Sequence, residues 1–258
     1  MRQHEARCTV FRALHDSGCF VLPNPWDVGS AQRLQRHGFK ALASTSAGMA
    51  WSLGRQDYAV TLNDALAHLT MLCAATDLPM NADFENGFAH APEDVAANVA
   101  RGAVTGVAGL SIEDRNGSAL YDLPLAVERI RAARASLDRV APGVLLVGRT
   151  EGFLLGNTDL DATIARLVAY GEAGAECLYA PGVKDVDQIR RIVAAVAPKP
   201  VNVLLMGPEM RVVELERAGV RRVSTGGALA AAAWAGFEEA VTMLLTEGHM
   251  PPRRRTGG

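Results

Sequence analysis

The 258-residue sequence lacks the features that mark secreted, membrane-spanning and nucleic-acid-binding proteins. Its few cysteines lie far apart, at Cys8, Cys19, Cys73 and Cys177. Because none of them has Cys-x-x-Cys spacing, neither a zinc site nor a disulfide framework is indicated. The formal net charge of -2 gives no electrostatic reason to expect nucleic acid or an anionic membrane as a partner. No apolar run is expected to cross a bilayer, and the polar N-terminus lacks the apolar core of a signal peptide, so we expect a cytoplasmic protein.

Short apolar runs instead alternate with longer helical segments along the whole chain. The runs have the length and composition of buried parallel strands, and they cover residues 18–22, 40–44, 78–83, 109–113, 144–148, 176–179, 201–205 and 222–224. Periodicity and capping residues predict helices over 26–37, starting after Thr61, and over 92–103, 162–170, 186–196 and 209–218. Eight βα units without a composition break predict one α/β domain, a (β/α)8 TIM barrel over residues 1–250, with a mobile tail over 251–258. A doubly wound sheet is the alternative.

The alanine-rich segment 228–235 predicts a further helix near the end of the chain. Its small side chains allow close packing on the barrel or on a partner subunit. Of these two, we expect packing in the core.

Polar side chains recur where the predicted strands end. In a TIM barrel these ends form the rim that carries the chemistry, so residues far apart in the sequence are expected to meet there. Together they describe a pocket with an acidic, metal-binding side and an arginine able to hold a carboxylate with two hydrogen bonds. The residues are Asn24, Ser44, Thr45, Ser46, Asp83, Glu85, Glu113, Asp114, Arg149, Glu151, Tyr179, Asn202, Ser224 and Thr225.

Purely structural roles compete with this interpretation. The 44–46 segment can satisfy loop amides as turn residues, and Asp114 is most simply part of a loop ion pair or a helix cap. Glu113 and Arg149 each end an apolar run, and a charge there is rarely buried without a partner. We therefore expect Arg149 to pair with Glu113 or Asp83. Spacing alone leaves open whether that pairing is structural or catalytic.

An ordered set of segments resembles one known family over nearly the whole chain. The segments are 22–27 (LPNPWD), 45–48 (TSAG), 53–57 (LGRQD), 81–88 (NADFENGF), 111–114 (SIED), 148–151 (GRTE), 173–176 (AGAE) and 200–203 (PVNV). In this order they resemble the isocitrate lyase/phosphoenolpyruvate mutase superfamily. The resemblance implies a barrel that is usually a homotetramer or other homo-oligomer, with its last helix exchanged between subunits. It also implies Mg²⁺, with Mn²⁺ as an alternative, and a small 2-oxo carboxylic acid as substrate.

On the metal side, the resemblance implies roles for four residues. Asp83 matches an acidic residue of the metal site, and Glu113 matches a carboxylate that reaches Mg²⁺ through water. Asn81 stands where many members have a metal-binding aspartate, so its neutral amide implies weaker metal binding. Glu85 is a further candidate ligand.

On the substrate side, Thr45, Ser46 and Ala47 match the loop that holds the substrate carboxylate and keto oxygen. Asp57 matches the aspartate of a mobile loop near the reacting atoms. Arg149 matches the arginine that binds the anionic end of the substrate, and Asn202 is a further candidate for substrate binding.

One segment departs from the family pattern. Isocitrate and methylisocitrate lyases carry a Lys-Arg-Cys-Gly-His loop soon after the Glu113 strand, whereas residues 115–122 here read RNGSALYD. The segment lacks both the catalytic thiol of the lyases and the lysine of the phosphonomutases, although Asn116 can replace the asparagine of the latter. We therefore expect a carbon–carbon lyase that needs no such base, such as one that decarboxylates an oxaloacetate-like acid through a metal-stabilised enolate. A phosphonomutase and a non-catalytic 2-oxo acid binder are the alternatives.

Overall fold

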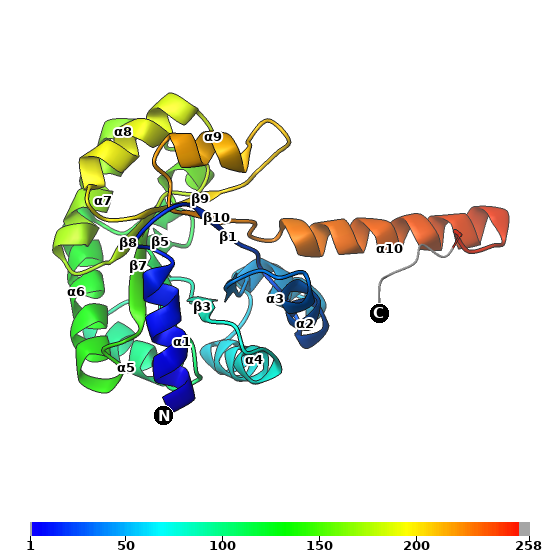
Figure 1. Cartoon of the computed structure of the whole chain (residues 1–258), viewed down its shortest axis with the longest axis horizontal. Helices are drawn as coiled ribbons and strands as arrows, with labels where there is room; N and C mark the ends of the chain where they lie inside the picture. Colours follow the sequence, from blue (N-terminus) through cyan, green and yellow to red (C-terminus); the bar gives the residue numbers. More distant parts are fainter. Residues whose placement is uncertain (1, 253–258) are drawn as a thin grey trace.

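The computed structural model describes residues 2–252 and contains eight parallel strands in one nearly closed sheet (Figure 1). The strand order is β1-β10-β9-β8-β7-β4-β3-β2. All eight predicted strands are confirmed, which excludes the doubly wound alternative. Their bounds are β1 Phe20–Leu22, β2 Leu42–Ala43, β3 Met80–Asp83, β4 Gly109–Glu113, β7 Leu145–Arg149, β8 Cys177–Tyr179, β9 Val201–Leu204 and β10 Arg222–Ser224.

The two ends of the sheet, β1 and β2, are linked by only a few hydrogen bonds. The Ala43 amide donates to the Pro23 carbonyl at 3.1 Å, and the Asn24 side-chain amide donates to the Ser44 carbonyl at 2.7 Å. The Asn24 side-chain oxygen also accepts from the amides of Thr225 and Gly226, both at 2.9 Å. Asn24 therefore holds the ends of β1, β2 and β10 together at the rim.

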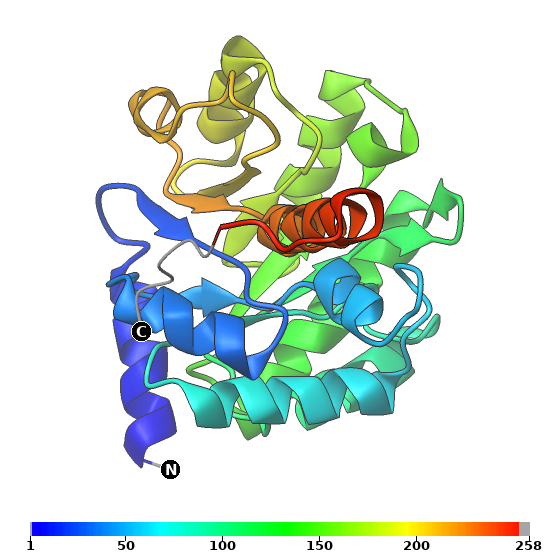
Figure 2. The same ribbon diagram turned by 90° about the vertical axis from the view of Figure 1, so that its right-hand side faces the viewer.

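Helices surround the barrel (Figures 1 and 2). Several begin where the sequence supplies a cap: Asp27, Asp159 and Asp185 each accept a hydrogen bond from a backbone amide of the first turn. The sequence patterns did not predict α1, α3 or α6. The helices are α1 Arg2–Ala13, α2 Val28–Arg36, α3 Ser46–Ser52, α4 Leu62–Ala75, α5 Pro92–Ala103, α6 Leu123–Val140, α7 Leu160–Glu172, α8 Val186–Val196, α9 Val212–Arg217 and α10 Ala228–Glu247, with a 3-10 turn over Gly152–Leu155.

Helix α1 covers the end of the barrel opposite the rim. Its Phe11 is fully buried, and a side-chain carbon built on Gly109 of β4 would lie 2.6 Å from the Phe11 ring and 2.7 Å from the Asn81 amide oxygen. Glycine is therefore required at position 109, because it lets Phe11 and the interior of the barrel approach each other.

Helix α10 corrects two expectations. It projects from the barrel (Figures 1 and 2), and only Ala230 of its residues is buried, so core packing of 228–235 is wrong. The helix is also long and apolar enough to cross a membrane by length and composition, contrary to the sequence expectation. An apolar helix that packs on protein passes the same test, so this is weak evidence for a membrane. Most of the predicted tail, residues 253–258, lies outside the described residues.

Candidate active site

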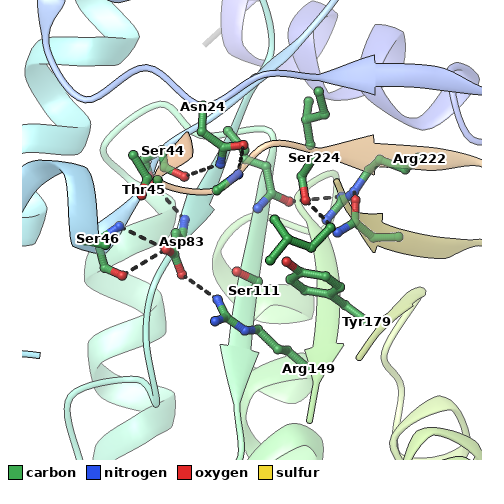
Figure 3. A pocket seen from close by; sticks show the side chains of 18 of the residues that line it. Asn24, Ser44, Thr45, Ser46, Asp83, Ser111, Arg149, Tyr179, Arg222 and Ser224 are labelled. Atoms are coloured by element: carbon green, nitrogen blue, oxygen red, sulfur yellow. Dashed lines mark hydrogen bonds and ion pairs between the residues drawn. The ribbon is translucent and has the colours of Figure 1, made fainter. Parts of the chain in front are cut away.

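A cavity of about 160 Å³ opens at the carboxyl ends of the strands. It has the volume of roughly five water molecules, which suits a small acid. In Figure 3, Ser46, Asp83 and Arg149 lie on one side of it and Arg222 and Ser224 on the other. Eight of the ten residues predicted for the site line the cavity: Thr45, Ser46, Ala47, Asp57, Asn81, Asp83, Arg149 and Asn202.

The other two predicted residues, Glu85 and Glu113, are buried next to the cavity rather than in its lining. Glu113 lies behind Arg149. Glu85 faces a neighbouring cavity of about 470 Å³ that is also lined by Tyr58 and Arg115. The predicted metal side therefore forms a wall between two cavities.

Arg149 is the centre of this wall. Its guanidinium lies 3.1 Å from Asp83, 3.3 Å from Glu113 and 2.6 Å from Glu151. Parallel pairing sets Glu113 directly beside Arg149 on the adjacent strands β4 and β7, which confirms the predicted ion pairing. Burial by itself lowers the pKa of Arg149, but the three carboxylates raise it well above its ordinary value. Arg149 is thus committed to charges of the protein itself.

The carboxylates of the wall have hard oxygen atoms of the kind that binds Mg²⁺. One oxygen of Glu85 and one of Glu113 are buried without a hydrogen-bond partner. Burial, together with Asp83 and Asp57, raises the pKa of Glu85 to about 8. Within residues 2–252 no three acidic, histidine or cysteine side chains are already arranged around one metal position. Mg²⁺ needs only one or two carboxylates with water and substrate, so these residues fit it.

Asn81 faces away from that wall. Its side-chain oxygen accepts a hydrogen bond from Arg222 at 3.3 Å, and its amide nitrogen donates to the Ala82 carbonyl at 3.0 Å. An oxygen that already faces a guanidinium is a poor position for a cation. This contact favours a place for Asn81 in the floor of the pocket.

The substrate loop combines structural and site contacts. The Thr45 hydroxyl caps α3 by accepting from the Gly48 amide at 3.2 Å, as expected of a turn residue. Ser46 donates to one oxygen of Asp83 through its amide at 2.9 Å and its hydroxyl at 3.0 Å. The same hydroxyl lies 3.3 Å from Asp57. Asp57 is exposed at the mouth of the cavity, and partial desolvation of its carboxyl together with the nearby Asp83 raises its pKa.

Two residues near the site, Tyr58 and Arg222, had no role in the sequence predictions, and a third, Glu151, was named there only as a residue of the rim. Glu151 is completely buried beside Arg149, and Arg222 lies in the pocket floor. Tyr58 has a left-handed backbone (φ 64°), stacks under the Arg115 guanidinium at 4.1 Å and points its hydroxyl at Glu151, 3.4 Å away. A backbone strain of this kind is invisible in a residue pattern.

Asp114 forms an ion pair, as expected, but its partner lies on a helix and not in its own loop. It lies 3.2 Å from Arg166 of α7 and accepts hydrogen bonds from the Tyr170 hydroxyl at 2.5 Å and the Glu151 amide at 2.9 Å. These contacts fix the loop that carries Glu151. Residues 115–120, which follow, form a small hairpin of β5 (Arg115–Asn116) and β6 (Ala119–Leu120).

Comparison with known proteins places this site in a family. The family model described as phosphoenolpyruvate phosphomutase matches residues 11–245. Oxaloacetate decarboxylase of Pseudomonas aeruginosa is 32% identical over 239 residues, covering 87% of this chain and 80% of that protein. A crystal structure of a candidate lyase/mutase from Burkholderia cenocepacia J2315 has a TM-score of 0.94 and 44% identity, covering 97% of this chain and 91% of that one. Oxaloacetate acetylhydrolase in complex with its product oxalate has a TM-score of 0.89 and 27% identity, covering 96% and 90%.

The match of the family model spans nearly the whole chain, and the strands that carry the site fall within it. The resemblance recognised in the sequence motifs is thereby confirmed. Enzymes of this group include lyases and mutases that act on small carboxylic acids. The chain belongs to the phosphoenolpyruvate phosphomutase family, within the isocitrate lyase/phosphoenolpyruvate mutase superfamily.

Proposed function

We propose that this chain is a Mg²⁺-dependent carbon–carbon lyase that decarboxylates a small, oxaloacetate-like 2-oxo acid. The observation that carries the proposal is the composition of the pocket. Among the described residues, its lining contains acids, amides, hydroxyls and arginines but no cysteine, histidine or lysine. Loss of CO₂ needs no base to break the bond; it needs a place for the electron pair. The oxaloacetate decarboxylase relative supports the same chemistry.

Different residues of the pocket have different roles in this reaction. The loop at Thr45–Ala47 orients the carboxylate and 2-oxo group of the acid, while Asp83 is held in place by Ser46 and Arg149. When the carbon–carbon bond breaks, CO₂ leaves and its electron pair remains on the substrate as an enolate. Asp83, Glu85 and Glu113 would hold Mg²⁺ on their side of the pocket, where the ion would supply a Lewis acid for the developing negative charge.

Asp57 then returns a proton to the enolate carbon. Partial burial and the nearby Asp83 raise the pKa of Asp57, and its position opposite the Ser46 hydroxyl places it at the mouth of the pocket. A carboxyl group at the mouth of the pocket, within reach of the bound acid, is suited to this proton transfer.

A panel of 2-oxo, 2-hydroxy and phosphono acids, incubated with protein and Mg²⁺ and analysed by mass spectrometry, tests the proposal. We expect loss of CO₂ from an oxaloacetate-like member. Asp83→Ala and Arg149→Ala, each shown to be folded by circular dichroism, should lose turnover, whereas Asp187→Ala on the exposed surface should retain it. Full turnover in both folded site variants would rule out this site.

The description of the matching family favours a second candidate, a phosphonomutase. Asn116 of β5 stands in the segment where such enzymes have an asparagine. In that case ³¹P NMR should show phosphonopyruvate converted to a phosphate ester. If metal-dependent binding of 2-oxo acids occurs without any product, the chain is instead a binding protein.

We further propose that the chain assembles into a homo-oligomer through α10. This helix exposes Trp234, Phe237, Leu244 and Leu245, and an apolar cavity of about 470 Å³ beside Trp26 and Met71 is large enough to receive such side chains. Light scattering should give a mass above that of one chain, and Phe237→Glu with Leu245→Glu should reduce it. A monomeric wild-type protein would exclude this assembly.

A further inference from the structure

The floor of the pocket contains a second arginine, Arg222 at the start of β10. Its side chain is 2% exposed and lies one layer below Ser224, because alternate residues of a barrel strand point inward. Its Nε donates to the Asn202 amide oxygen at 3.0 Å, and its Nη1 donates to the Asn81 amide oxygen at 3.3 Å. The Asn202 nitrogen in turn donates to Ser224 at 3.0 Å. These contacts fix the plane of the guanidinium.

The charge of Arg222 has no counter-ion in the described part of the chain. Both of its acceptors are neutral amides, its Nη2 has no acceptor there, and none of the ion pairs of residues 2–252 includes it. Burial lowers the pKa of its guanidinium, yet an arginine in a protein stays protonated. A buried, unpaired charge is costly, and an anion placed against it removes that cost.

The two arginines of the pocket therefore differ in what they offer to a ligand. Arg149 already faces three carboxylates within 3.3 Å, whereas Arg222 faces none. An acid that enters the cavity therefore meets the positive charge of Arg222, which no carboxylate neutralises, at the floor. The cavity of about 160 Å³ reaches from the loop at Ser46 to Arg222, since both line it.

We propose that Arg222 binds a second acidic group of the substrate, so that the pocket selects small acids with two anionic ends over monocarboxylic acids of equal length. The inference relies on the proposed function only for the end of the acid that reacts near Ser46 and Asp83. The second group is a carboxylate or a phosphonate. Both are anions with at least two oxygen atoms that can accept paired hydrogen bonds from a guanidinium.

Calorimetric titration with three unreactive ligands in Mg²⁺ tests this selectivity: malate, 2-hydroxybutyrate with the same carbon skeleton and one carboxylate, and 3-phosphonolactate. A charge-assisted hydrogen bond corresponds to a preference of about 10- to 100-fold for malate over 2-hydroxybutyrate. Arg222→Gln should remove the preference while 2-hydroxybutyrate binds as before, and Arg222→Lys should retain part of it. A stronger preference for 3-phosphonolactate would identify the phosphonate as the natural group.

Arg129→Gln is the matched control, because Arg129 is also a buried arginine but donates to backbone carbonyls away from this pocket. It should leave the preference unchanged. No preference in the wild-type protein, or a preference that survives in folded Arg222→Gln, would overturn the inference, and if Arg222→Gln does not fold, the wild-type and Arg222→Lys results decide. Because no ligand has to react, absence of decarboxylation would count against the proposed function and not against this site.

Discussion

Lowering the pH from about 7.5 to about 5 should destabilise the protein through one histidine, His15, at the closed end of the barrel. His15 is 8% exposed, and its ring packs edge-on against Phe11 and Phe20 with centroids 4.8 and 5.1 Å away. Nδ1 lies 2.7 Å from the Phe11 carbonyl, and Nε2 is buried without a partner. Burial and the charge of Arg222 lower the pKa of His15 to about 3, against the smaller opposing effect of the Phe11 carbonyl.

The sign of the effect follows from comparing the folded and unfolded chains. In the unfolded chain a histidine binds a proton below about pH 6.5, whereas folded His15 stays neutral down to about pH 3. The stabilisation is therefore complete above about pH 6.5 and is lost as the pH falls. Each pH unit below that point costs about 1.4 kcal/mol, so His15 removes roughly 2 kcal/mol of unfolding free energy by pH 5.

Urea unfolding followed by circular dichroism at both pH values measures this loss. His15→Leu cannot titrate and should lose roughly 2 kcal/mol less than the wild-type protein between the two pH values, although it starts about 1 kcal/mol lower without the Phe11 hydrogen bond. His37→Gln, at an exposed position, should behave as the wild-type protein does. An identical pH dependence in His15→Leu, or an NMR titration of His15 near pH 6.5, would refute the reasoning.

Three further predictions concern the barrel and its wall. Arg149→Met leaves Glu113 and Glu151 buried without their partner, so it should lower the free energy of unfolding, measured by thermal denaturation, by about 3–5 kcal/mol. Arg190→Met, at an exposed position, should change the free energy of unfolding by less than about 0.5 kcal/mol. Gly109→Ala brings a methyl group against Phe11 and should cost about 1–3 kcal/mol; an unchanged urea midpoint would contradict the tight approach. Mg²⁺ should raise the melting temperature of the wild-type protein, EDTA should reverse the rise, and Glu113→Gln should show a smaller one. An equal rise in the melting temperature of Glu113→Gln would show that Glu113 does not contribute to metal binding.

The barrel was predictable because each buried parallel strand is a short apolar run between helices. The run at 109–113, for example, coincides with β4. Helix α10 shows where this reasoning fails. Its apolar residues predict burial, but a sequence pattern does not say whether the same chain supplies the covering surface, and here most of the helix is exposed.

The candidate site was predictable at the rim for a similar reason. Residues that end adjacent strands must meet, so Glu113 and Arg149 were expected to pair and do so at 3.3 Å. What the pattern did not reveal is the direction of Asn81 or the importance of Arg222. Both lie two residues before a rim residue, Asp83 and Ser224, and strand periodicity places such residues on the same inner face one layer deeper. Applying that period to every strand would have identified the polar floor.

The two layers give the pocket opposite charges at its two ends. The mouth carries the acidic side chains of Asp57 and Asp83, and Arg149 is shared between Asp83 and the buried Glu113 and Glu151. The floor carries the unpaired Arg222. A doubly charged acid must therefore pass an acidic mouth before it reaches the positive floor, and like charges at short range oppose its entry. A divalent cation bound to these carboxylates would reverse the sign of the charge at the mouth, so the Mg²⁺ that we propose for the reaction would also favour entry of the substrate.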